Sequence, residues 1–152
     1  MDLSQIDDQL YIAARPQSAD APEVAAHGVR LILNMIPVKT PAALGSAPFR
    51  VVWLPWLDAP FLPIPIRLLR RGTRAALAAM QSGDSVLTYC RQGRHRSVAM
   101  ACAILIAKGM TADQAMRHVT QQRPRADPGA AHIARVIRRF EREWPDGRPP
   151  SE

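Results

Sequence analysis

The amino-acid sequence predicts an α/β fold in which a central, mostly parallel sheet of about four to five strands is flanked by helices. Short apolar segments of strand length alternate with helical segments up to Cys90, and only helical segments follow. Such alternation is typical of parallel strands joined by helical crossovers. The chain has 152 residues, enough to bury a sizeable core. We therefore expect a single domain over residues 1–144 and a flexible C-terminal tail over residues 145–152.

The strands are predicted from apolar segments rich in β-branched and aromatic residues. They lie at residues 10–13 (LYIA), 30–36 (RLILNMI), 50–57 (RVVWLPWL) and 85–90 (SVLTYC). The third segment contains Pro55 near its end, where a missing backbone N–H is tolerated. Prolines punctuate residues 37–48 and 58–65, so we expect loops there. Ligands of such sheets bind beyond the carboxyl ends of the strands, which is where Cys90 lies.

Helices are predicted over residues 20–27, 65–80, 97–108, 111–122 and 127–144. The segment Ser97–Lys108 (SVAMACAILIAK) is almost wholly apolar and should therefore occupy the centre of the molecule. Thr111 and Gln114 have the spacing of a capping box at the start of the next helix. We expect Asp127 to cap the last helix, with Pro128 at its first position.

Cysteine usage and the N-terminus indicate a reducing compartment. The chain has two cysteines, Cys90 and Cys102, which form no disulfide framework. Cys102 falls within the apolar helix, so we interpret it as a small core residue rather than a redox partner of Cys90. The N-terminus, MDLSQIDDQL, is acidic, and no run approaches the roughly 18–20 apolar residues of a membrane span. We expect a cytoplasmic protein without a transmembrane segment.

The net charge of +7 comes almost entirely from arginine, since Lys39 and Lys108 are the only lysines. A basic chain could bind nucleic acid or an anionic membrane surface. The arginines are spread along the chain, however, and aromatic residues for base stacking make up only 5% of it. We therefore expect no nucleic-acid partner, and we expect the protein to act as a monomer.

The stretch TYCRQGRHRSVAM, residues 88–100, places one cysteine among three arginines. A strand ends at Cys90, the chain turns, and a buried helix begins near Ser97. The amides of the turn and of the helix N-terminus then point to one spot and favour an anion there. Gly93 permits the unusual backbone angles that such a turn needs. A cysteine held in this turn is stabilised as a thiolate and is a reactive nucleophile near neutral pH.

The residues that close the turn suit phosphoryl transfer through a phosphocysteine. The planar guanidinium of Arg96 can hold two oxygens of a phosphate group. Ser97 can hydrogen-bond the sulfur and help it to leave the covalent intermediate. The alternatives are a basic turn without chemistry and a zinc site that uses Cys90 and His95. No second pair with zinc-ligand spacing occurs, so we expect neither a metal nor a cofactor.

The motif Cys90-x5-Arg96-Ser97 resembles the signature of the protein tyrosine phosphatase superfamily, and residues 5–143 resemble its small dual-specificity branch. IDDQLYIAARPQSAD is similar to the opening strand and turn of that branch, GVRLILNMI to its second strand and QQRPRADP to the segment before its final helix. The resemblance implies a dual-specificity-phosphatase-like fold, a phosphorylated substrate and a phosphate-binding loop. The loop residues are Arg91, Gln92, Gly93, Arg94, His95 and Arg96. Tyr89 departs from the usual histidine, and we expect it to retune the thiol without abolishing activity.

Attack by a thiolate on a phosphate ester expels an alkoxide or phenoxide, which a nearby acid must protonate. Asp58 begins the proline-rich loop after a predicted strand, where the resemblance places the general acid. Asp127 is the alternative, because an Asp-Pro pair late in the chain is similar to the low-molecular-weight phosphatases. Those enzymes carry their cysteine loop near the N-terminus. We therefore prefer Asp58 as the acid and then the base.

Arg91 and Arg94 are the best indication of the substrate. Superfamily members that act on phosphoinositides or phosphatidylglycerophosphate carry basic residues at these two loop positions, so the resemblance implies a polyanionic substrate. Alternatively, both side chains point outward and only raise the local potential, and we expect His95 to face solvent.

The leading hypothesis is a cysteine-dependent phosphomonoesterase of dual-specificity type. The alternatives are a phosphoinositide or phosphatidylglycerophosphate-type lipid phosphatase with the same chemistry and an inactive phosphate-binding module. A sulfurtransferase or arsenate reductase could also use such a loop, but it would not need Asp58.

Overall fold

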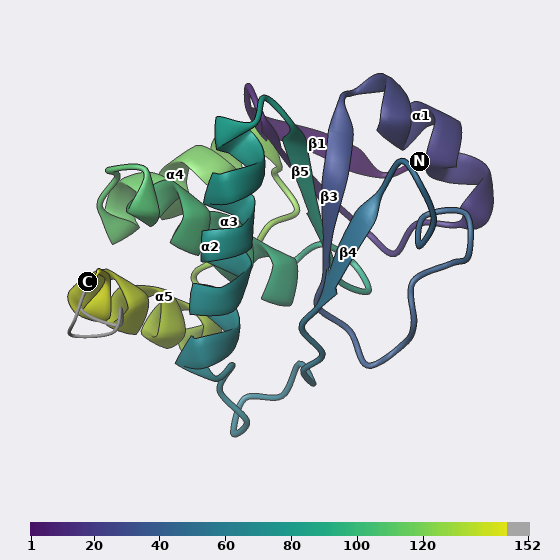
Figure 1. Cartoon of the computed structure of the whole chain (residues 1–152). Coiled ribbons are helices and arrows are strands. Elements are labelled where there is room, and N and C mark those ends of the chain that lie inside the picture. The colour runs from purple at the N-terminus through teal and green to yellow at the C-terminus, as the bar shows by residue number, and fades with distance from the viewer. Residues whose placement is uncertain (146–152) are drawn as a thin grey trace.

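A computed structural model describes residues 1–145 and contains a five-stranded sheet with helices on both faces (Figure 1). The strands are β1 (Leu3–Asp7), β2 (Leu10–Ala13), β3 (Val29–Asn34), β4 (Arg50–Trp53) and β5 (Ser85–Tyr89). They lie in the order β1-β2-β5-β3-β4, and every neighbouring pair is parallel except β1 and β2. The predicted α/β class with a mostly parallel sheet is confirmed.

The helices are η1 (Ser18–Asp20), α1 (Ala21–Ala26), α2 (Ile66–Gln81), α3 (Arg96–Ala107), α4 (Ala112–Gln122) and α5 (Ala131–Glu143). Helices α2 to α5 gather on one face of the sheet, and α1 lies on the other (Figure 1). Helix α3 is buried from Arg96 to Ile106, between the strands β2 and β5 and the helices α2, α4 and α5. The prediction that this apolar helix is central is confirmed. Within residues 1–145, no helix is long and apolar enough to cross a membrane.

The carboxyl ends of three parallel strands meet at one edge of the sheet. Tyr89, the last residue of β5, pairs with Ala13 of β2 on one side and with Asn34 of β3 on the other. Beyond the sheet, the amide of Met35 donates to the Tyr89 carbonyl at 3.0 Å. The segment that follows β5 is therefore held between its two neighbours, and it begins at Cys90.

Two strand predictions differ from the structure. The strand β4 ends at Trp53 and not at Leu57, although the amides of Leu54 and Trp56 still donate to the carbonyls of Asn34 and Met35 beyond the end of β3. The strand β1 was not expected as a separate element. Within it only Ile6 is buried, so no alternation of apolar residues indicates it.

The last helix also begins later than predicted. Helix α5 starts at Ala131 with Ala130 at its N-cap, so the prediction that Asp127 caps it is wrong. The amide of Asp127 donates to the Arg94 carbonyl at 3.0 Å, and its carboxylate contacts side chains of the loop after β5. The capping box predicted at the start of α4 is present. The predicted tail at residues 145–152 lies outside the described residues, apart from Pro145.

Candidate active site

The loop from Cys90 to His95 joins β5 to α3 and lies at one wall of a pocket of about 440 Å³. The lining residues are Pro37, Leu57, Asp58, Cys90, Arg91, Gln92, Arg94, His95 and Arg96. Among residues 1–145 no side chain caps the N-terminus of α3, and such an uncapped end favours an anion. The predicted phosphate loop thus lines a pocket that also contains the predicted acid.

Cys90 is almost completely buried, with 2% of its surface exposed, and its Sγ lies 3.1 Å from the Oγ of Ser97. Burial alone raises the pKa of the Cys90 thiol. Hydrogen bonds from the Ser97 hydroxyl and from the backbone amides of Ser97 and Arg94 lower it, as does the charge of Arg96, so the net pKa lies below its ordinary value. The environment therefore favours a thiolate at the end of β5.

Arg96 begins α3 and is itself buried, with 7% of its surface exposed. Its Nη1 donates to the carbonyl of Trp56 at 2.7 Å, while its Nε has no hydrogen-bond partner among residues 1–145. A buried guanidinium with an unused donor needs an acceptor. A phosphate group in the pocket would supply one, since the guanidinium fork matches two phosphate oxygens.

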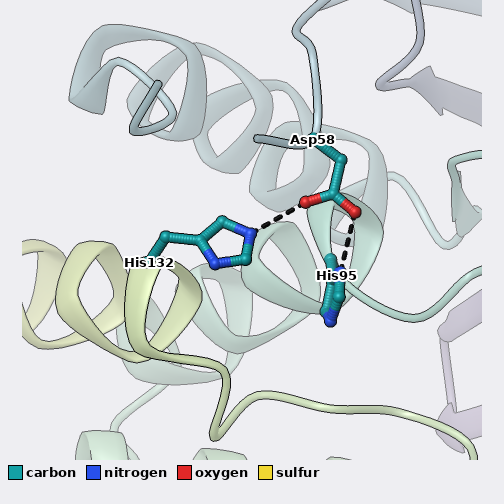
Figure 2. Close-up of side chains that lie close together, drawn as sticks. All are labelled: Asp58, His95 and His132. Atoms are coloured by element: carbon teal, nitrogen blue, oxygen red, sulfur yellow. Dashed lines mark hydrogen bonds and ion pairs between the residues drawn. The ribbon is translucent and has the colours of Figure 1, made fainter. Parts of the chain in front are cut away.

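Asp58 lies in the loop that follows β4, and its carboxylate is held by two imidazoles (Figure 2). The His95 Nδ1 is 2.7 Å from Oδ2, and the His132 Nε2 is 2.8 Å from Oδ1. Partial burial raises the pKa of Asp58, but the hydrogen bonds from His132 and His95 and the charges of His95 and Arg96 outweigh that effect. The net pKa lies below the ordinary value for an aspartate, so the carboxyl is ionised in the resting site.

The expectation that His95 faces solvent is wrong. Its side chain is only 18% exposed, and its Nε2 lies 3.2 Å from the Oδ2 of Asp127 while its Nδ1 contacts Asp58. Both aspartates considered for the general acid therefore contact the same imidazole, from opposite sides of the ring. Asp58 is the one of the two that lines the pocket with Cys90.

A family model of the dual specificity phosphatase catalytic domain matches residues 10–142, which include every residue of the pocket. The chain belongs to the dual specificity phosphatase family. It is therefore a domain of the cysteine-based phosphatases, which are phosphoric monoester hydrolases.

The relatives support this assignment. Dual specificity phosphatase 28 of Homo sapiens is 31% identical over 129 residues, a match that covers 83% of this chain and 70% of that protein. A 59-residue match to dual specificity protein phosphatase 1 of Arabidopsis thaliana is 44% identical, and it covers 38% of this chain. The matched segment spans 30% of the length of that Arabidopsis protein.

Solved structures share the fold over nearly the whole chain. The crystal structure of human DUSP28 superposes with a TM-score of 0.83 at 25% identity, covering 93% of this chain and 94% of that one. PTPMT1 in complex with PI(5)P has a TM-score of 0.82 at 21% identity, with 93% and 95% of the two chains covered. At the latter identity the likeness shows the fold alone.

The additional loop arginines of this phosphatase both line the pocket. Arg91 and Gln92 are exposed, and the Arg91 carbonyl accepts a hydrogen bond from the Arg15 amide at 3.1 Å. The Arg94 side chain is 52% exposed, with an Nη2 3.5 Å from Asp127. Their cationic groups therefore lie at the mouth of the pocket, while Arg96 is buried deeper in it.

Sequence reasoning missed Arg123, which supports the loop from behind. Its side chain is 1% exposed, and its guanidinium donates to the carbonyls of Gly93 and Gln92 at 2.7 and 3.0 Å. A bidentate ion pair with Asp2 at 2.9 Å balances its charge. The position of Arg123 in QQRPRADP gave no indication of this role, because the partners are 30 or more residues distant.

Tyr89, the departure from the family motif, is fully buried directly before Cys90. Its hydroxyl lies 3.0 Å from the Oγ1 of Thr40, which also accepts from the Nδ2 of Asn34 at 2.9 Å. Burial raises the pKa of Tyr89, so the ring stays a neutral phenol. The tyrosine thus ties the end of β5 to the loop after β3.

Cys102 has the opposite environment. It is fully buried within α3, and burial raises the pKa of its thiol far above the ordinary value. The interpretation of Cys102 as a core residue agrees with this position.

Proposed function

We propose that the protein hydrolyses phosphate monoesters through a phosphocysteine on Cys90. The observation that carries the proposal is a buried thiol at the uncapped N-terminus of α3, next to a buried arginine whose Nε has no hydrogen-bond partner among residues 1–145. The loop residues 91–96 are the proposed phosphate-binding loop, as the sequence predicts.

In the first step, the Cys90 sulfur attacks phosphorus, the S–P bond forms and the bond from phosphorus to the leaving oxygen breaks. Arg96 and the loop amides hold the non-bridging oxygens, where negative charge develops. In the second step, water attacks phosphorus and the thiolate leaves. The Ser97 hydroxyl, 3.1 Å from the sulfur, stabilises that thiolate by a hydrogen bond.

Asp58 is the proposed acid and then base. The two imidazoles hold its carboxyl ionised in the resting site, which suits the activation of water in the second step. For the first step the carboxyl must carry a proton. A dianionic phosphate bound beside it favours the protonated form, because like charges disfavour ionisation.

The substrate is a phosphorylated protein or a polyanionic small molecule. Arg91 and Arg94 at the mouth of the pocket favour a substrate with a second anionic group. A lipid or inositol phosphatase with the same chemistry is therefore the second candidate, and the fold likeness to PTPMT1, solved with PI(5)P, is consistent with it. Cytoplasmic localisation, a monomeric state and the single domain over residues 1–144 stay predictions.

The proposal is tested by phosphate release from an aryl phosphate in the presence of EDTA. We expect turnover by the wild type and none by the Cys90→Ser variant. Turnover that survives Cys90→Ser, or a complete absence of turnover with correctly folded protein, would contradict the proposal. A substrate panel of phosphopeptides, phosphoinositides and phosphatidylglycerophosphate then separates the two candidate substrate classes.

Substrates with different leaving groups test whether Asp58 or Asp127 is the general acid. Asp58→Asn should slow turnover of alkyl phosphates by about 10²–10⁴-fold, and should affect aryl phosphates less, because a phenoxide needs less help from an acid. Asp127→Asn is the matched control. A leaving-group-dependent loss confined to Asp127→Asn would reverse the assignment.

A further inference from the structure

Two histidines and one aspartate converge beside the phosphate pocket from separate parts of the chain (Figure 2). Asp58 comes from the loop after β4, His95 from the loop after β5 and His132 from the first turn of α5. One ligand atom from each lies within 4.8 Å of the others. The side chains are 30%, 18% and 13% exposed, so the cluster is partly shielded and still reachable from solvent.

The donor set is that of a transition-metal site. Two imidazoles and one carboxylate are ligands that first-row divalent ions such as zinc bind well, whereas magnesium and calcium prefer oxygen ligands alone. Three protein ligands leave a fourth tetrahedral position for water or a substrate oxygen. The cluster therefore fits a zinc-like ion at a site with one open position.

Asp127 gives an independent indication. Its carboxylate Oδ2 lies 3.2 Å from the Nε2 of His95. The Nδ1 of the same ring lies 2.7 Å from a carboxylate oxygen of Asp58, so the imidazole stands between two carboxylates. A metal ion bound between Nδ1 and Asp58 would leave Nε2 to donate to Asp127. A carboxylate behind a histidine ligand is the usual outer partner of a protein-bound zinc.

We propose that Asp58, His95 and His132 bind a zinc-like divalent ion, and that this ion inhibits the phosphatase. An ion coordinated by Asp58 occupies the lone pairs of the carboxyl that would accept and deliver the proton. The inhibition rests on the proposed function of Asp58, whereas the binding of the ion does not.

Binding is measured with Co²⁺, which takes zinc sites and absorbs visible light when bound. The full chain with Cys90→Ser is used, so that the thiolate cannot act as the ligand. We expect one equivalent of Co²⁺ to bind, and His132→Gln in the same background to weaken binding more than about tenfold. Asp127→Asn should weaken it by about tenfold as well. His27→Gln is the matched control, because His27 is an exposed histidine outside the cluster, and it should leave binding unchanged.

Inhibition is measured by titrating metal-free wild type with Zn²⁺. We expect turnover of alkyl phosphates to fall more than that of aryl phosphates, and His132→Gln to raise the inhibitory concentration of zinc more than about tenfold. Circular dichroism confirms that each variant is folded.

The metal site would be overturned if Co²⁺ did not bind, or if Co²⁺ bound equally well with and without His132→Gln. If Co²⁺ binds as expected but zinc leaves turnover unchanged, the proposed inhibition is wrong although the site exists. If the wild type shows no turnover at all, the proposed function alone is refuted.

Discussion

At the scale of single residues, Cys90 and Cys102 show how surroundings set the chemistry of a thiol. Both are buried, and for both burial alone raises the pKa of the thiol. At Cys90 the hydroxyl of Ser97, two backbone amides and Arg96 reverse that effect, whereas at Cys102 no group within the described part of the chain offsets it. A difference of partners, not of burial, therefore lowers the pKa of one thiol and raises that of the other.

Removing the Ser97 hydroxyl should raise the pKa of Cys90, because the hydroxyl's hydrogen bond favours the thiolate. The thiolate is present above the pKa and is lost as the pH falls through it. In the Ser97→Ala variant, the rate of alkylation by iodoacetamide should therefore decline at a higher pH than in the wild type. Cys102→Ala is the control and should leave the profile unchanged. An identical profile for Ser97→Ala would show that the hydroxyl does not set the reactivity of the thiol.

At the scale of elements, the loop after β5 is held from both sides. Strand neighbours fix its entry at Tyr89, and the buried Arg123 binds two of its carbonyls from behind. Gly93 allows this arrangement, because its φ is 62° and an added Cβ would lie 2.5 Å from the Arg123 guanidinium. The loop amides are thereby oriented before any phosphate binds.

Gly93→Ala should destabilise the loop for two reasons, namely the positive φ of this residue and the close contacts of the added Cβ. Gly83 is the matched control, since its φ is 87° and no atom of residues 1–145 lies within 4 Å of an added Cβ. Gly83→Ala should lower the free energy of unfolding by about 1–2 kcal/mol through backbone strain. Gly93→Ala should lower the free energy of unfolding by a larger amount, because its Cβ would also lie 2.8 Å from the carbonyl oxygen of Ala13. The same substitution should weaken phosphate binding. Chemical denaturation measures the free energy of unfolding of both variants, and phosphate titration measures their binding. An equal loss of stability in the two variants would count against the close packing at Gly93.

Arg123→Met should destabilise the protein by about 3–5 kcal/mol, because it leaves two loop carbonyls and Asp2 without their buried partner. Arg125 also contacts Asp2, but its side chain is 55% exposed, so Arg125→Met should change stability by less than about 1 kcal/mol. Thermal unfolding of the two variants measures the difference. Similar losses would mean that neither arginine has a special role in holding the loop.

At the scale of the whole molecule, the sequence predicts those features that depend on residues close together in the chain. The motif from Cys90 to Ser97 is contiguous, and the capping box at the start of α4 needs only four residues, so both were readable from the sequence. The convergence of His95 and His132 on Asp58 was not, because these contacts join residues 37 and 74 positions apart. For the same reason the sequence predicts Asp127 as a helix cap, although its carboxylate contacts His95, 32 positions away.

The fold brings these distant residues together because the parallel strands β2, β5 and β3 end at one edge, and the loop after β4 reaches the same pocket. The N-terminus of α3 points its amides at that edge, and α5 contributes His132 from the side. The candidate nucleophile and phosphate-binding loop form one segment of the sequence, and Asp58 and His132 come from two others. The fold makes the three segments neighbours.

The central claim is that Cys90 carries the phosphoryl group during turnover. The direct measurement is rapid acid quench during turnover of an aryl phosphate, followed by mass spectrometry of the peptide that contains Cys90. We expect a phosphoryl group on the Cys90 sulfur, at a higher level in the Asp58→Asn variant because the base that activates water is missing. A phosphoryl group on another residue, or steady turnover with Cys90 never phosphorylated, would contradict it.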